Sequence, residues 1–221
     1  MILKYLLAIS GVFTVLIFII YRTSVWPSGL EAFESLITFL SLLGSFLLIQ
    51  IFSNKLFSQQ NNISKGLAIG LTWTVEIGMN NIIQPGLPLR DHLDNIFWAI
   101  IAMLILFISI RSSYKTNKFS NGLFAGLFSG FSSGAVACLS ALTLILFGMH
   151  LLLTDVINIK EWKELLNQAY YRNMSVYFAY QTMAGAILHL LVLGAVMGLL
   201  LGLIGGAIGK LSVNLKSKKN F

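Results

Sequence analysis

Charged residues are scarce in this chain, and their scarcity excludes an ordinary soluble domain. Only 10% of the residues are charged, whereas 57% are hydrophobic and the mean hydropathy is +0.82. A soluble globular domain carries about 25% charged residues. Uncharged runs long enough to cross a bilayer as a helix, roughly 17–25 residues, divide the sequence. The composition therefore predicts an all-α integral membrane protein in contact with the lipid bilayer.

Cysteine and nucleotide-binding motifs are also nearly missing. A single cysteine, Cys138, excludes an intramolecular disulfide and a cysteine-based metal cluster. No glycine-rich loop ending in Lys-Ser or Lys-Thr occurs, so any ATP hydrolysis would belong to a partner. The net charge of +7 comes from basic residues scattered between apolar runs, so we expect no nucleic-acid partner. We also expect no cofactor.

The uncharged runs predict a six-transmembrane-helix bundle that forms one membrane domain, residues 1–221. The segment Pro85-Gly86-Leu87-Pro88 ends one helix, and Asp91 or Asp94 is suited to cap the next. The runs 119–154 and 173–209 exceed one crossing, which leaves open a long tilted helix or a re-entrant hairpin. The expected spans are 5–21, 35–52, 66–84, 94–110, 120–147 and 183–209, with an extracytoplasmic interfacial amphipathic helix over 156–171 and a basic tail over 210–221.

Basic residues fall unevenly on the two sides of this arrangement. Ten of the 15 lysines and arginines lie at the N-terminus, in the second and fourth links and in the tail. The positive-inside tendency assigns these segments to the cytoplasm. We therefore expect a multi-pass protein of the cell membrane, of the bacterial plasma-membrane type, with both termini cytoplasmic.

Polar side chains follow one face of the third predicted span. Glu76, Asn80 and Gln84 recur every four residues, which places them on one side of a helix. Counting from Lys65 puts Glu76 about 16 Å deep, near the middle of the bilayer. A charged carboxylate there costs at least a few kcal/mol, so Glu76 would be protonated, hydrated or bound to a cation. The candidate binding or ion-path residues are Glu76, Asn80, Asn81, Gln84, Thr72, Ser129, Ser132 and Ser133.

A second polar group lies at the outer boundary. It consists of Arg90, Asp91, His92 and Asp94. The same depth count places His92, His150 and His189 near this boundary, which leaves Glu76 without a basic partner. The spacing of the three histidines matches no zinc motif, so we expect no metal site.

Two interpretations of Glu76 stay open. In the first, it binds a proton, cation or solute in a small transporter, channel or solute-binding membrane subunit. In the second, it is neutral and holds two helices together through a hydrogen bond to a serine. The chain carries no strong catalytic motif, so we do not expect an enzyme.

Glycine recurs every four residues in the last two spans. A face without side chains lets helix backbones approach closely in lipid. Such faces pack within one chain, or they join a homo-oligomer or hetero-complex, as in a non-catalytic assembly or docking subunit. The expected packing residues are Gly122, Gly126, Gly130, Gly134, Gly194, Gly198, Gly202 and Gly206.

Two features resemble known families. Gly130-Phe131-Ser132-Ser133-Gly134, with His189 in a later span, resembles the serine and histidine of rhomboid intramembrane proteases. The rhomboid pattern is Gly-x-Ser-Gly, and the extra serine here makes an intramembrane hydrolase a remote alternative. The general outline of six glycine-rich spans resembles the substrate-binding subunits of energy-coupling factor transporters. The small residues that dock those subunits are missing, since Ala8 is followed four residues later by Val12.

Overall fold

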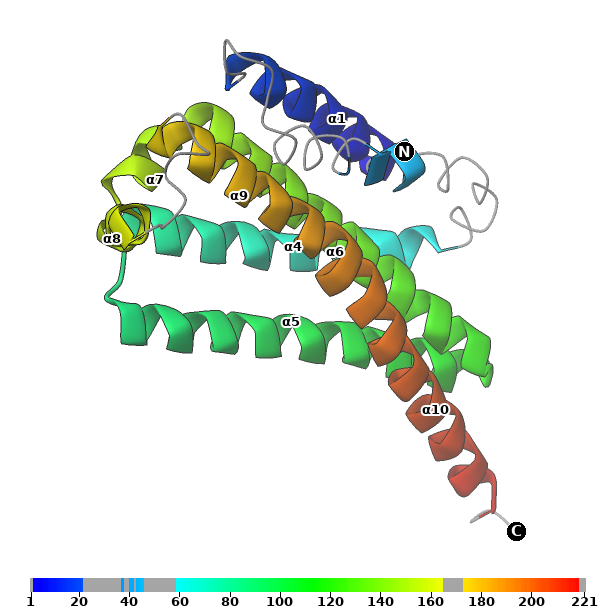
Figure 1. Ribbon diagram of the computed structural model, residues 1–221. Coiled ribbons are helices and arrows are strands. Elements are labelled where there is room, and N and C mark those ends of the chain that lie inside the picture. Colours follow the sequence, from blue (N-terminus) through cyan, green and yellow to red (C-terminus); the bar gives the residue numbers. More distant parts are fainter. Residues whose placement is uncertain are drawn as a thin grey trace.

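All regular structure in the described part of the chain is helical. The computed structural model describes residues 2–21, 37, 40–41, 43–45, 59–164 and 173–218. Within these ranges the helices are α1 Ile2–Ile20, α4 Gln60–Gly78, α5 Leu87–Thr116, α6 Phe119–Phe147, α7 Met149–Thr154, α8 Val156–Glu164, α9 Met174–Leu188 and α10 Met197–Lys218 (Figure 1). Two π-helical segments, η1 Met79–Ile83 and η3 His189–Val196, extend α4 and join α9 to α10. The expected all-helical fold is confirmed for these residues.

Within the described residues, four helical stretches are long and apolar enough to cross a membrane, which makes the chain a multi-pass membrane protein. They are Ile2–Ile20, Leu87–Thr116, Phe119–Phe147 and Met174–Lys216. The third predicted span, 66–84, is helical as α4 and η1, but its polar residues keep it out of this set. The second predicted span, 35–52, lies largely outside the described residues. The described residues thus contain four candidate spans, and they do not show the six that the sequence predicted.

Several helix boundaries differ from the expected ones. Helix α5 begins at Leu87 rather than near residue 94, because Pro88 fits the first turn of a helix, where no backbone N–H is needed. No side chain caps this end, so the expected cap from Asp91 or Asp94 is wrong. Of the two long runs, 119–154 is divided at Gly148, and 173–209 belongs to one continuous rod formed by α9, η3 and α10. The amphipathic helix expected over 156–171 is α8 as far as Glu164, and residues 165–171 lie outside the described part.

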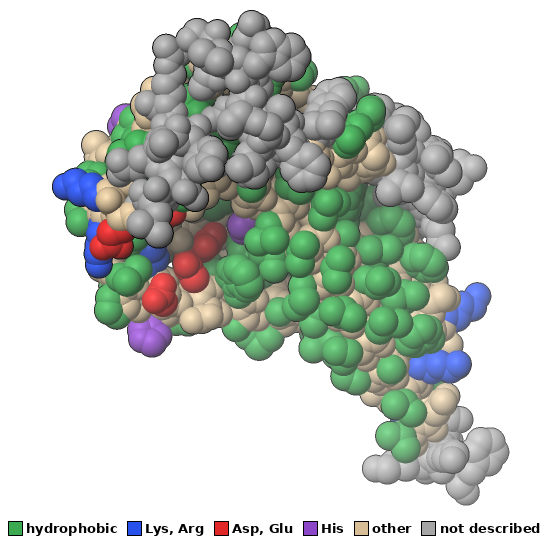
Figure 2. All heavy atoms as spheres, viewed as in Figure 1, with side chains coloured by type: hydrophobic (Ala, Val, Ile, Leu, Met, Phe, Trp, Pro, Cys, Tyr) green, Lys and Arg blue, Asp and Glu red, His purple; other side chains and the backbone are tan. Residues whose placement is uncertain are grey.

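The two ends of the bundle differ in charge. The turn 84–86, α7 and α8 lie at one end, called the acidic end here, where acidic side chains gather (Figures 1 and 2). The turn at Asn117 and Lys118 lies at the other end, called the basic end, and both chain termini lie toward it (Figure 1). Hydrophobic side chains cover most of the described surface between the two ends on the face seen in Figure 2.

Toward the basic end, α6 and the α9–η3–α10 rod pack backbone against backbone. A Cβ atom on Gly126 would lie 2.4 Å from the Cα of Gly202, and one on Gly130 would lie 2.6 Å from the Cα of Gly198. The same relation, at 2.6 and 2.9 Å, holds for the pairs Gly122 with Gly206 and Gly134 with Gly194. The two glycine faces thus cover each other within one chain, which allows the close approach that stabilises helix pairs in lipid.

Serine hydroxyls join α5 to this glycine contact. Ser109 Oγ lies 2.8 Å from the carbonyl oxygen of Gly122 and 3.1 Å from that of Gly202. Ser113 Oγ donates to the carbonyl of Gly206 at 2.7 Å. Because both serines are fully buried, these bonds supply the partners that lipid does not offer.

Candidate functional site

The chain leaves the α-helical path two residues after Glu76. Helix α4 ends at Gly78, the π-helical segment η1 follows, and Gln84 takes a left-handed conformation with φ 51°. Pro85 has no N–H, so it cannot bond to the carbonyl of Asn80 five residues earlier. Instead, Arg90 Nη2 donates to that carbonyl from the first turns of α5. The break therefore brings an arginine next to the polar face of α4.

The side chain of Asn80 bridges two carboxyl groups. Its Nδ2 donates to Asp94 Oδ1 at 2.8 Å and to Glu76 Oε1 at 3.3 Å. Glu76 is only 7% exposed, and both Asp94 and Arg90 are close enough to act on its charge. Glu76 Oε2 and Asn80 Oδ1 are buried without a hydrogen-bond partner among the described residues. Two acceptor oxygens therefore remain free beside a carboxyl pair.

A buried ion pair closes the acidic end around this group. Arg90 Nη2 lies 2.7 Å from Asp155 Oδ2, and the two side chains are 14% and 2% exposed. The other carboxyl oxygen of Asp155 accepts the backbone N–H of Ile157 at 2.8 Å, in the first turn of α8. Asp155 therefore fixes α8 to α5 and also supports the start of α8.

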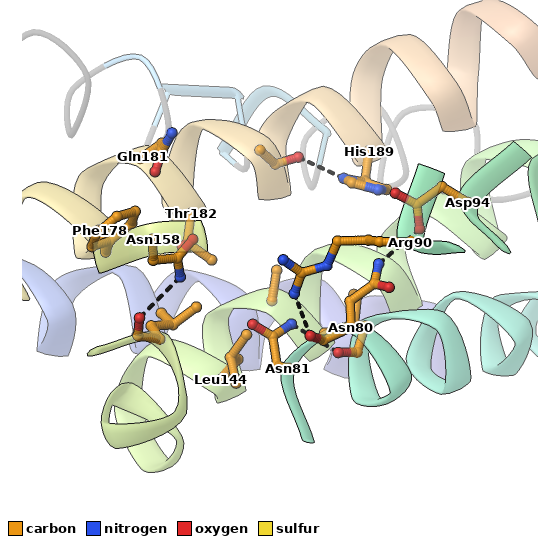
Figure 3. A pocket seen from close by; sticks show the side chains of 14 residues that line it. Asn80, Asn81, Arg90, Asp94, Leu144, Asn158, Phe178, Gln181, Thr182 and His189 are labelled. Carbon is orange, nitrogen blue, oxygen red and sulfur yellow. Dashed lines mark hydrogen bonds between the residues drawn. The ribbon is translucent and has the colours of Figure 1, made fainter. Parts of the chain in front are cut away.

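A cavity of about 300 Å³ opens between these elements (Figure 3). Its volume is at the lower end of the range for small-molecule sites, about 300–1,000 Å³. Its polar lining residues are Asn80, Asn81, Arg90, Asp94, Asn158, Gln181, Thr182 and His189, and its apolar wall includes Ile77, Ala141, Leu144, Leu152 and Phe178. Glu76 lies behind Asn80 and Asp94 rather than on this wall. The cavity is thus polar where η1, α5 and η3 meet.

His189 lies on this wall and not apart from Glu76 as expected. Its ring contacts the indole of Trp73, one turn before Glu76, with ring centroids 4.8 Å apart. His189 Nδ1 lies 2.7 Å from the carbonyl of Gly185. The depth count therefore separated His189 from the third span too far. The described residues show no ion pair to Glu76, since Arg90 pairs with Asp155. The depth count assumed that each span crosses the membrane straight, whereas the rod runs obliquely across α4 and α5 (Figure 1).

The predicted site residues separate into two groups. Asn80 and Asn81 line the cavity, and Gln84 donates to the carbonyl of Leu151 in α7 at 3.4 Å. The three serines lie deeper toward the basic end, beside Gly66 and Gly70 of α4, about 9 Å or more from Glu76 along the helix. They are Ser129, Ser132 and Ser133. Thr72 lies one turn before Glu76 in α4 and does not line the described cavity.

The described contacts give no support to the serine–histidine pair of a protease. Ser132 Oγ bonds to the carbonyls of Phe128 at 2.6 Å and Ile63 at 3.1 Å. His189 bonds to Gly185 in its own helix. Within the described residues, no hydrogen bond joins His189 to Ser132 or Ser133, although a nucleophile and its base need such contact.

The predicted outer polar group is also divided. Arg90 and Asp94 turn into the cavity, whereas Asp91 and His92 are exposed. The cavity-lining residues Asn158, Gln181 and Thr182 were not predicted from the sequence, nor was Asp155 as the ion-pair partner of Arg90. One signal for Asp155 was available, because it is the first charged residue after Lys118. An isolated charge at the end of so long an apolar run suggests a buried partner.

Neither the arrangement of possible metal ligands nor comparison with known proteins assigns a function to this site. In the described ranges, no group of three or more His, Cys, Asp or Glu side chains is arranged to hold a metal ion. Comparisons with protein-family models, with curated proteins and with solved structures find no match.

Proposed function

We propose that this protein binds a proton, a cation or a small polar solute at the acidic end of the bundle, as a small transporter, channel or solute-binding membrane subunit. The observation that carries the proposal is the buried bridge from Glu76 through Asn80 to Asp94 at the wall of the cavity. Ionisable groups inside a membrane protein are costly and usually mark an ion or substrate path. Glu76 is the innermost member of the site.

The shape of the helices supports this proposal. Helix breaks near a binding site are common in transporters, because the freed backbone groups and helix ends face the ligand. Here one π-helical segment follows Glu76 and another begins at His189. π-helical turns are frequent at functional sites. Both segments border the cavity through Asn80, Asn81 and His189.

The contacts described support the alternative, a docking subunit, less well than they support a transporter, channel or binding subunit. Its binding surfaces would be the glycine faces, yet those of α6 and the α9–η3–α10 rod are in contact with each other. A partner or second copy would have to use another surface.

The test compares Glu76→Gln with the wild-type protein. Full-length protein is placed in liposomes with a trapped pH-sensitive dye, and proton flux is followed under imposed Na⁺ or K⁺ gradients. In parallel, a panel of polar solutes is screened for thermal stabilisation of the purified protein. We expect Glu76→Gln to lower the responding signal by about tenfold or more.

The matched control is Glu164→Gln, the same change at a side chain that is 68% exposed on α8. It should leave flux and solute binding at the wild-type level. Equal signals from the wild type and Glu76→Gln, with both correctly folded, would contradict the proposal.

A further inference from the structure

The charges around the cavity do not balance within the described residues. Three carboxyl groups, Glu76, Asp94 and Asp155, face one guanidinium, that of Arg90. Arg90 Nη2 is already bound to Asp155 and to the carbonyl of Asn80. Arg90 also acts on the charge of Glu76, but a single guanidinium cannot neutralise three carboxylates.

The Glu76 and Asp94 carboxyls lie within reach of one amide nitrogen, so both belong to the same small site. Two carboxylates this close repel each other unless a proton or a cation lies between them. The remaining faces offer little compensation. Helix α6 presents Ala141 and Leu144. His189 of η3 meets the ring of Trp73 edge-on, and its Nδ1 lies within hydrogen-bond distance of the carbonyl of Gly185.

Free oxygen atoms are available for a ligand at this place. Glu76 Oε2 and Asn80 Oδ1 are buried without a hydrogen-bond partner in the described part of the chain, and Glu76 is more than nine-tenths buried. An unpartnered buried oxygen is costly. Carboxylate and amide oxygens are also the ligands that hard cations prefer.

We propose that the Glu76–Asn80–Asp94 site exchanges a proton for a monovalent cation that enters through the cavity. Without the cation, one proton is held between the two carboxyls. When the cation binds to the carboxyl and amide oxygens, the carboxyl O–H bond breaks and the proton leaves to water through the cavity. One positive charge replaces another, so the charge of the site does not change. This inference rests on the proposed function and names its ligand.

The experiment measures proton release by the full-length protein in weakly buffered lipid nanodiscs with a pH-sensitive dye. NaCl, KCl and methylammonium chloride are added in separate titrations, with choline chloride as the control for ionic strength. We expect at least one of the three to release about one proton per chain in a saturable way, and choline to release none. The three titrations distinguish an inorganic cation from an ammonium group.

The variants Glu76→Gln and Asp94→Asn should each abolish the saturable release. Asp91→Asn is the matched control, because Asp91 is exposed in the same helix, and it should release protons as the wild type does. If Glu76→Gln does not fold, Asp94→Asn and the wild-type titrations still decide the question. Release that does not saturate, that choline also causes, or that survives in a folded Glu76→Gln or Asp94→Asn variant would overturn the exchange.

The liposome assay separates failure of this inference from failure of the proposed function. If Glu76→Gln removes flux or solute binding while no cation releases a proton, the proposed function stands and the exchange is wrong. If cations release a proton in the wild type but no gradient drives flux, the site exchanges ions and the chain alone does not transport them.

Discussion

The hydrogen bonding of several buried polar groups differs between the two ends of this bundle. Toward the basic end, Ser109 and Ser113 donate to glycine carbonyls of neighbouring helices. At the acidic end, Glu76 Oε2 and Asn80 Oδ1 are buried without a partner among the described residues. The first arrangement closes the gap between helices, whereas the second leaves acceptors beside a cavity. In one half, serine hydroxyls join neighbouring helices, and in the other, acceptor oxygens that are unpaired within the described ranges lie beside a cavity.

The largest effect is expected from a side chain forced into the glycine contact. In Gly126→Leu, even the Cβ atom would lie 2.4 Å from the Cα of Gly202, so the helices must separate. We expect a loss of more than about 4 kcal/mol, seen as loss of monodisperse protein and of cooperative thermal unfolding in detergent.

The control for this prediction is Gly11→Leu in α1, where a Cβ atom meets no atom of the described residues within 4 Å. It should change the free energy of unfolding by about 0.5 kcal/mol or less. If both variants behave alike, the glycine contact does not hold the basic half together.

The next effect concerns the ion pair at the acidic end. Arg90→Met and Asp155→Asn each leave one buried charge of the 2.7 Å pair without its partner, which should cost about 3 kcal/mol. The double variant should lose less than the sum of the single variants, because neither member of the pair is left without the other. Unfolding in mixed micelles measures all three.

The exposed pair Lys160 and Glu164 provides the comparison. Its atoms are 3.9 Å apart and its side chains are 75% and 68% exposed, so Lys160→Met should cost about 0.5 kcal/mol or less. Purely additive effects at Arg90 and Asp155 would contradict a coupled pair.

A smaller loss is expected at the serines of the basic half. Ser109→Ala removes bonds to Gly122 and Gly202 and should destabilise by about 0.6 kcal/mol and at most about 1.7 kcal/mol, the average and the maximum found for hydrogen bonds between membrane helices. Ser212→Ala is the control, because its exposed hydroxyl donates to the carbonyl of Ile208 in the same helix. An equal change in both unfolding free energies would show that the bonds between helices add nothing.

The smallest effect concerns the two turns with positive φ, one at each end. Gln84 and Asn117 both have φ 51°, a conformation that asparagine adopts more readily than glutamine. Gln84→Asn should stabilise by up to about 1 kcal/mol, and the reverse change Asn117→Gln should destabilise by a similar amount. Thermal unfolding of both variants measures this. Changes of the same sign would contradict the backbone explanation.

Local features of the fold were predictable from the sequence. Proline cannot continue a helix, so the break at Pro85 was found, and four-residue glycine spacing indicated faces able to pack closely. The boundaries of α5 were less predictable. Asp94 reads as a cap by its residue type, yet Pro88 lets the helix begin earlier, and Asp94 is then free to bind Asn80.

The candidate site was predictable in part, because its members come from separate elements. Glu76 and Asn80 were found through their four-residue spacing within one helix. Arg90, Asp155 and His189 were not connected to them, since residue counting gives depth along a helix but not its rotation or tilt. The π-helical segments change that rotation, and nothing in the residue spacing indicates where they occur.

By itself, the sequence determined that the chain is a helical membrane protein with a buried acidic residue, because hydropathy, helical period and proline chemistry are local properties. Only the tertiary structure decided which groups meet around that residue. Helix crossing brought Asp94, Arg90 and His189 to the place where α4 breaks, and it turned the glycine faces of α6 and the α9–η3–α10 rod toward each other. The relative rotation of packed helices depends on all their contacts at once, which no single segment encodes.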